Sequence, residues 1–167
     1  MAQTAKDGKF DKLIEMIDGI DVAMMTSIDQ GHLRSRPMWT LKDPDFAGTL
    51  YFFTRLSSHK IEELQSNPQV GLSYGNPSKQ DYVSVSGHAR LSRDPERMRR
   101  LWAEPMRTWF PEGLDDPDLG LLAVEIEMAE YWDSPSSAMV HLYGYAKAAI
   151  TGQSPKPGDH GKLNMPH

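Results

Sequence analysis

The feature that most restricts the fold of this chain is a succession of short strand-like segments separated by turn signals. Alternating or β-rich runs predict strands at residues 22–28, 32–39, 50–54, 69–74, 82–91 and 121–128. Short turns such as Asp29-Gln30-Gly31 suit antiparallel pairing of neighbouring strands. The pattern predicts a mainly β, α+β domain: a small six-stranded barrel with peripheral helices, not a doubly wound parallel sheet.

Single residues add detail to two of these strands. Proline cannot donate to a strand ladder, so Pro37 predicts an edge or a bulge for its strand. Alternation places Val124, Ile126 and Met128 on one face of the last strand.

Helical segments interrupt the strands. Apolar spacing predicts a helix over residues 9–18, and Asp94-Pro95 is a capped helix start. Further helices are expected after the serines at 57–58 and over residues 105–110. The spacing of Trp102, Met106, Trp109 and Phe110 is typical of a buried helix face or of a dimer interface.

Domain organisation follows from length and composition. The 167 residues fit one domain, which we place at residues 1–150. Residues 151–167 are polar and rich in proline and glycine, which predicts an extended or disordered tail.

Charge and composition exclude several classes of function. The net charge of −5 disfavours a nucleic-acid partner. The chain has no cysteine, and its six histidines show no ligand-like spacing, so no metal site is predicted. No signal peptide or membrane-spanning stretch is evident, which favours a cytoplasmic location and no membrane partner.

The segment from Leu50 to Lys60 carries the clearest chemical signal. An aromatic strand ends there and a helix begins, with cationic groups in the first helical turn. Cations are unfavourable at a helix N-terminus, whereas an anion is favourable there. A phosphate would accept hydrogen bonds from the free amides, from Ser57 or Ser58, and from Lys60. An ordinary serine-capped helix with a solvated lysine is the alternative.

The strand at 32–39 supplies a second part of the same signal. Alternation points Arg36 and Met38 to the same face. A charged group and a soft apolar group on one face suit a flat ligand with a ring and a charged end. An edge strand with an exposed arginine is the alternative.

These segments together resemble the pyridoxamine-phosphate-oxidase-like flavin split barrels, and above all the bacterial general stress protein branch. The matching windows lie within residues 10–150, in the order found in that family. They are Leu33-Arg34-Ser35-Arg36-Pro37-Met38, then Phe52-Phe53-Thr54 through Ser58-His59-Lys60 and on to Asn67-Pro68, then Tyr82-Val83-Ser84-Val85-Ser86-Gly87, and more weakly Tyr131-Trp132-Asp133.

The resemblance implies a dimeric split barrel with flavin mononucleotide (FMN) in each of two grooves at the subunit interface. It assigns Arg36 and Lys60 to the phosphate or the ribityl chain, with Ser58 and His59 flanking the lysine. Trp132 resembles a late tryptophan that reaches the flavin across the dimer. The residues implied along the cofactor are Pro37, Met38, Trp39, Phe53 and Thr54.

Two departures separate the chain from the oxidases of that family. His59 stands where they have arginine, and no arginine-leucine-histidine signature follows Trp132. The resemblance therefore implies an FMN-dependent oxidoreductase of unknown substrate. The alternatives are a non-catalytic flavin-binding or flavin-buffering stress protein, a pyridoxamine or pyridoxine phosphate oxidase, and a split barrel for a deazaflavin or a haem-derived ligand. No catalytic acid or base is assigned.

Overall fold

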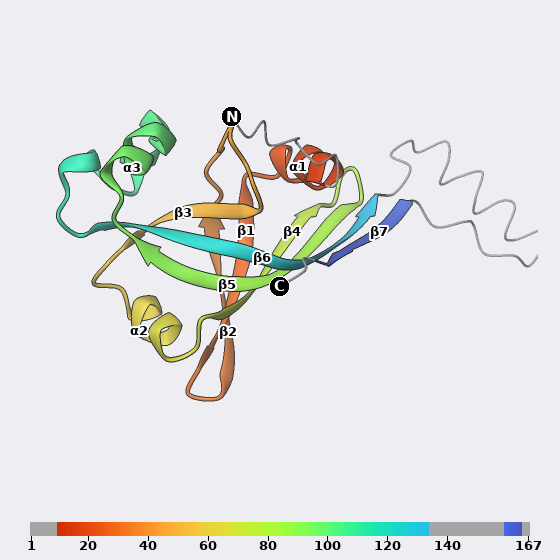
Figure 1. The fold of residues 1–167 in the computed structure, drawn as a ribbon, viewed down its shortest axis with the longest axis horizontal. Helices are drawn as coiled ribbons and strands as arrows, with labels where there is room; N and C mark the ends of the chain where they lie inside the picture. The colour runs from red at the N-terminus through yellow and green to blue at the C-terminus, as the bar shows by residue number, and fades with distance from the viewer. Residues whose placement is uncertain (1–9, 134–158, 165–167) are drawn as a thin grey trace, which may run out of the picture.

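The fold is an α+β arrangement built on one mostly antiparallel sheet (Figure 1). The computed structural model describes residues 10–133 and 159–164. Along the sheet the strand order is β2-β1-β4-β5-β6-β3, and β7 pairs with β6. The strands are β1 (Val22–Asp29), β2 (His32–Trp39), β3 (Thr49–Arg55), β4 (Gln69–Asn76), β5 (Asp81–Ser92), β6 (Leu119–Asp133) and β7 (Asp159–Asn164).

The sheet is not a closed barrel, in agreement with the split barrel expected from the sequence. Its two ends, β2 and β3, meet at one bridge among the described residues, where the Leu41 amide donates to the Tyr51 carbonyl at 2.9 Å. Of the edge or bulge predicted for Pro37, the structure shows an edge, because β2 pairs with β1 alone among the described strands. The opening between β2 and β3 positions the candidate site.

Two apolar clusters hold the elements together. The larger one fills the inside of the curved sheet and includes Phe52, Tyr74 and Val85, with α1 (Asp11–Asp18) packed against it. The smaller one lies between β3, β6 and the excursion that joins β5 to β6. That excursion contains α3 (Pro95–Leu101), η2 (Glu104–Thr108) and η3 (Gly113–Asp115).

The predicted helix signals correspond to real elements. Asp94 caps α3 by accepting hydrogen bonds from the Glu96 and Arg97 amides. The helix α2 (His59–Ser66) follows the aromatic strand β3, as predicted. Figure 1 shows α2 and α3 near one end of the long β5–β6 pair and β7 at the other end.

The prediction that Met128 lies on the same face as Val124 and Ile126 is wrong. Met128 is 36% exposed, and Ala129 is buried in its place. The register explains the switch: Gly87 pairs with Ile126 while its neighbour pairs with Met128, so Glu127 is an extra residue in β6. An added residue reverses the alternation of side chains beyond it.

The sequence predicts a folded domain that ends near residue 150. Residues 159–164 lie beyond that point and form β7, which is extended as expected but belongs to the sheet. Gly161 leaves room for the ring of its partner Tyr131, since a Cβ at that position would lie 2.3 Å from this ring. The sequence also predicts a helix at the end of residues 138–150, and that segment lies outside the described residues. Within the described part of the chain, no helix is long and apolar enough to cross a membrane.

Candidate functional site

A cleft of about 470 Å³ opens between β2 and β3, where the sheet is split. The first residues of α2 and the excursion between β5 and β6 complete its walls. The lining residues are Val22, Pro37, Met38, Trp39, Phe53, Thr54, Arg55, Ser58, Lys60, Met106, Trp109 and Phe110.

Lys60 and Thr54 form the polar end of the cleft. The Lys60 ammonium donates to Thr54 Oγ1 at 2.8 Å, and the Thr54 side chain is almost completely buried. Burial lowers the pKa of Lys60 below its usual value, and the positive charge of Arg36 lowers it further. A cation held in this way has few competing partners and is well placed to meet an anion.

Ser58 lies at the N-cap of α2 but makes no side-chain capping bond. Its Oγ is buried and has no hydrogen-bond partner among the described residues. The next two amides, of His59 and Lys60, belong to the first turn, where a helix supplies no acceptor. A buried hydroxyl without a partner is rare in a native fold, so this end of α2 has unused donors.

Ser57 is engaged elsewhere. Its amide donates to Asp118 Oδ1 at 2.8 Å and its hydroxyl to Asp118 Oδ2 at 2.7 Å. The Ser57 hydrogen bonds keep the pKa of Asp118 below its usual value. The side chain of Ser57 thus fixes the loop before α2 and does not line the cleft.

Arg36 is joined to a buried carboxylate on α2. Its guanidinium donates to Glu63 Oε2 and to Ser27 Oγ, both at 2.7 Å. Ser27 itself donates to Glu63 at 2.5 Å, and Arg34 donates to the other carboxylate oxygen at 2.9 Å. Burial raises the pKa of Glu63, but the Ser27 hydrogen bond and the charge of Arg36 outweigh it and leave that pKa below its usual value.

His59 extends this network at the surface. Its ring nitrogens lie 3.3 Å from Asp29 and 3.1 Å from Glu62, and the hydrogen bond with Asp29 is the main cause of its raised pKa. Ligand atoms of Asp29, His59 and Glu63 lie within 4.8 Å of one another, as in some metal sites. The same carboxylates already accept hydrogen bonds from Arg34 and Arg36, so we assign this cluster to ion pairing.

Trp132 lies far from the cleft of its own chain. It stacks on His160 of β7, with ring centroids 5.4 Å apart. On β6 the neighbours of cleft residues Phe53 and Thr54 are Leu121 and Gly120. Trp132 is eleven or more residues further on, which corresponds to about 35 Å of strand.

The cleft therefore brings together many, but not all, of the residues singled out in the sequence. Those that line it are Pro37, Met38, Trp39, Phe53, Thr54, Ser58 and Lys60. Arg36 and His59 lie beside it in the ion-pair network, whereas Trp132 is remote.

Sequence reasoning missed several residues of the site. The lining positions Val22, Arg55, Met106, Trp109 and Phe110 were not among the candidates. Glu63 was also missed, although two arginines on one strand face are a signal that a buried carboxylate lies opposite.

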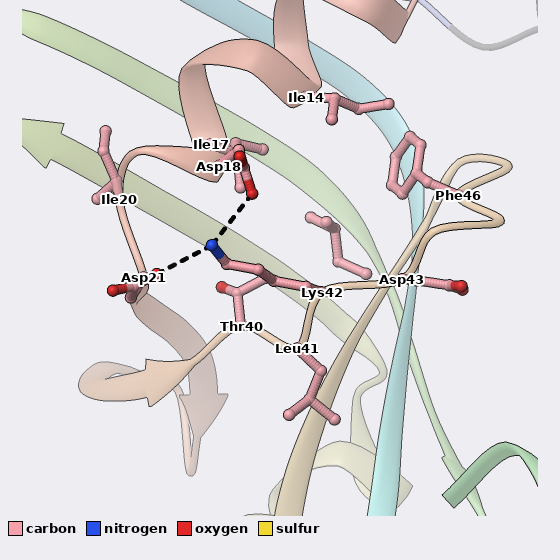
Figure 2. Close-up of a pocket in the computed structure, with 11 residues that line it drawn as sticks. Ile14, Ile17, Asp18, Ile20, Asp21, Thr40, Leu41, Lys42, Asp43 and Phe46 are labelled. Carbon is pink, nitrogen blue, oxygen red and sulfur yellow. Dashed lines mark ion pairs between the residues drawn. The ribbon is translucent and has the colours of Figure 1, made fainter. Parts of the chain in front are cut away.

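A smaller pocket of about 90 Å³ lies between α1 and the loop after β2. Figure 2 shows Lys42 reaching from this loop toward Asp18 and Asp21, at 3.3 and 4.0 Å. Ile14 and Phe46 border its other side. Since Lys42 is paired with these two aspartates, Asp43 is paired with Arg100, and the other walls are mostly apolar, we place the candidate site in the larger cleft.

Comparison with known proteins identifies the family. The family model described as "Pyridoxamine 5'-phosphate oxidase like" matches residues 8–156. The chain belongs to the pyridoxamine 5′-phosphate oxidase-like family. The family resemblance read from the sequence is thus confirmed.

Individual proteins are similar to this chain in sequence or in fold. General stress protein 26 of Bacillus subtilis (strain 168) is 30% identical over 119 residues, covering 70% of this chain and 82% of that protein. A candidate general stress protein 26 from Jannaschia sp. CCS1 has the same fold, with a TM-score of 0.77 at 21% identity over 93% of this chain and 97% of that one. The general stress FMN/FAD binding protein of Xanthomonas citri has a TM-score of 0.66 at 28% identity, over 76% and 89% of the two chains.

Proposed function

We propose that this protein binds FMN in the cleft between β2 and β3 and works as a cytoplasmic flavin-dependent oxidoreductase of the general stress type. The observation that carries the proposal is the polar end of the cleft, where Lys60 lies at the start of α2 beside the Ser58 hydroxyl, which has no hydrogen-bond partner within residues 10–133 and 159–164. The relative from Xanthomonas citri, an FMN/FAD binding protein, supports a flavin as the ligand.

The residues at this end suit a phosphate. Lys60 supplies a positive charge, Ser58 supplies a hydroxyl, and the first amides of α2 supply donors aligned with the helix dipole. Arg36 contributes through its positive charge, because its hydrogen bonds are directed to Glu63 and Ser27. His59 adds charge at the rim when it is protonated.

The rest of the cleft suits a flat ring. Pro37, Met38 and Trp39 form one wall, and Phe53 lies on the other. The exposed edges of β2 and β3 offer backbone groups to the polar rim of a ring system. When bound, FMN would supply hydride or electron transfer, and the chain would orient it and exclude water.

We further propose that two copies assemble into a homodimer with the flavin groove at their interface. The cross-strand register places a set of exposed apolar side chains on one outer face of the sheet: Val22, Met24, Tyr82, Met128 and Trp132. Exposed apolar surface of this kind is typical of association sites. In such a dimer Trp132 of one copy is proposed to reach the flavin of the other.

The direct test is the visible spectrum of the purified protein, followed by extraction and identification of the chromophore. A Lys60→Ala variant is expected to bind FMN at least tenfold more weakly, since hydrogen bonds to a charged group contribute about 1.5–3 kcal/mol. The matched control is Lys42→Ala, which removes an exposed lysine from the smaller pocket. A colourless protein that also fails to bind added FMN would overturn the proposal.

A non-catalytic flavin-binding protein is the second candidate. One observation favours it: no carboxylate or imidazole lines the cleft among the described residues. Turnover of the FMN-loaded protein with a nicotinamide donor separates the two functions. Peroxide release with pyridoxamine phosphate would instead indicate a vitamin B6 phosphate oxidase.

A further inference from the structure

Part of the cleft has an aromatic lining, formed by Trp39, Trp109 and Phe110, and we call it the Trp39–Trp109 end. Trp39 comes from the last position of β2, whereas Trp109 and Phe110 follow η2 in the excursion between β5 and β6. The rings of Trp39 and Trp109 lie 5.5 Å apart between centroids, tilted by 41°. This end is therefore formed by two segments that are distant in sequence.

Trp109 differs from its neighbours in the excursion. Met106 and Phe110 are buried in the smaller apolar cluster, but Trp109 is 49% exposed. Its position is fixed all the same, because Arg55 donates to the Trp109 carbonyl at 3.0 Å. A large ring that is held in place yet left half exposed at a cleft is available to a ligand.

The charges at this end have one sign. Arg55 lines the cleft, with its guanidinium 5.5 Å from the centre of the Phe110 ring. Its guanidinium pairs with Asp116 at 3.4 Å and with Asp118 at 3.9 Å, and neither carboxylate lines the cleft. With no carboxylate in the described lining, this end disfavours a cation and accepts a neutral or anionic group.

Hydrogen-bonding capacity points the same way. The indole N–H groups of Trp39 and Trp109 donate to no acceptor among the described residues, whereas the indole of Trp102 donates to Glu104 at 3.3 Å. A ligand that carries oxygen acceptors would satisfy such donors.

We infer that the Trp39–Trp109 end of the cleft is a substrate subsite for a planar aromatic ring that bears oxygen acceptors and no positive charge. This inference rests on the proposed function, since the ring would lie beside FMN held from the Lys60 end. In this arrangement the Lys60 end holds the cofactor by its phosphate, and the Trp39–Trp109 end selects the substrate by shape and charge.

Equilibrium dialysis of the FMN-loaded protein tests the subsite with two probes of similar size, 2-naphthoate and the N-methylquinolinium cation. We expect 2-naphthoate to bind at least tenfold more tightly than the cation. Trp109→Ala should weaken 2-naphthoate binding about tenfold while FMN affinity changes less than threefold. Trp109→Phe, which keeps a ring but loses the N–H, should fall between. Leu33→Ala, at an exposed hairpin position, is the control and should change neither affinity.

Three results would overturn the inference. The first is equal or tighter binding of the cation, and the second is no binding of either probe. The third is an equal loss of FMN and 2-naphthoate affinity in Trp109→Ala, which would assign this end to the cofactor. If FMN does not bind but 2-naphthoate binds in a Trp109-dependent way, the proposed function fails and the subsite stands.

Discussion

The guanidinium of Arg36 lies 2.7 Å from the carboxylate of Glu63, so the strand on one side of the cleft is joined directly to the helix on the other. Arg36 comes immediately before the wall residues of β2, and Glu63 lies one turn after Lys60 in α2. The pair thereby sets the spacing between the ring wall and the cationic end. Its energetic and functional effects are open to measurement.

Removal of Glu63 should destabilise the fold. The Glu63 side chain is 1% exposed, and its loss leaves Arg36 beside Ser27 without a counter-charge. Removing one partner of a buried ion pair lowers the free energy of unfolding by about 3–5 kcal/mol. Because Arg36 is partly exposed, we expect the lower end of this range, about 3 kcal/mol, for Glu63→Ala. Urea unfolding measures the change. Glu62→Ala, at a far more exposed neighbouring position, should cost less than about 0.5 kcal/mol, and equal losses in both variants would contradict the role of the pair.

The stability of the fold should decrease at low pH because of the Glu63 carboxyl group. The pKa of Glu63 is lower in the folded protein than its ordinary value of 4.5. Such a group stabilises the fold above its unfolded pKa, and this contribution is lost as pH falls through the folded pKa. Between about pH 5 and pH 3, the wild type should lose stability more steeply than Glu63→Gln. Parallel urea midpoints for the two proteins over this range would refute the prediction.

FMN affinity should fall at alkaline pH because of Lys60. Burial and Arg36 lower its pKa from the ordinary 10.5, so its charge is lost earlier than in a free lysine. A Lys60→Arg variant keeps its charge throughout this range. Between about pH 8 and pH 10 we expect the wild-type dissociation constant to rise relative to that of Lys60→Arg. Titration by flavin fluorescence measures both, and identical pH profiles would exclude Lys60 as the titrating group.

Gly87 should tolerate no side chain at the bulge between β5 and β6. A Cβ at this position would lie 2.2 Å from the Glu125 carbonyl oxygen, which is backbone and cannot move aside cheaply. Gly87→Ala should lower the free energy of unfolding by about 3 kcal/mol. Gly71→Ala on the adjacent strand β4, where the nearest atom is 3.9 Å away, is the matched control. Thermal melts that rank the two variants equally would contradict the clash.

Local signals predicted most of the fold. Strand alternation, the edge position of Pro37 and the Asp94 cap depend on a few neighbouring residues, and the structure confirms them. The side of the sheet on which Met128 lies could not be predicted in this way. It depends on the bulge at Glu127, which results from the register between β5 and β6. The strand β7 was missed for a similar reason: Gly161 lies in a run with little strand propensity, and the partner strand β6 orders it.

The candidate site likewise has a part that local sequence predicts and a part that depends on tertiary packing. Ser58 and Lys60 belong to one continuous strand-turn-helix segment, so their proximity was predictable. The attachment of Arg36 to Glu63 spans 27 residues and two elements, and Trp109 reaches the cleft from an excursion that begins after β5. Such contacts depend on tertiary packing, which a single sequence does not reveal.

The single bridge between Leu41 and Tyr51 has a broader consequence. A full ladder between β2 and β3 would close the sheet into a barrel, with no space for a ligand between these two strands. Among the residues that the structure describes, β2 and β3 are joined at this one bridge, and the cleft lies beyond it. The backbone hydrogen bonds of a full β2–β3 ladder are absent, and the cleft is open to a ligand as a result. New ligand preferences can therefore evolve in this fold through substitutions along the facing edges of β2 and β3, while the other strands of the sheet stay unchanged.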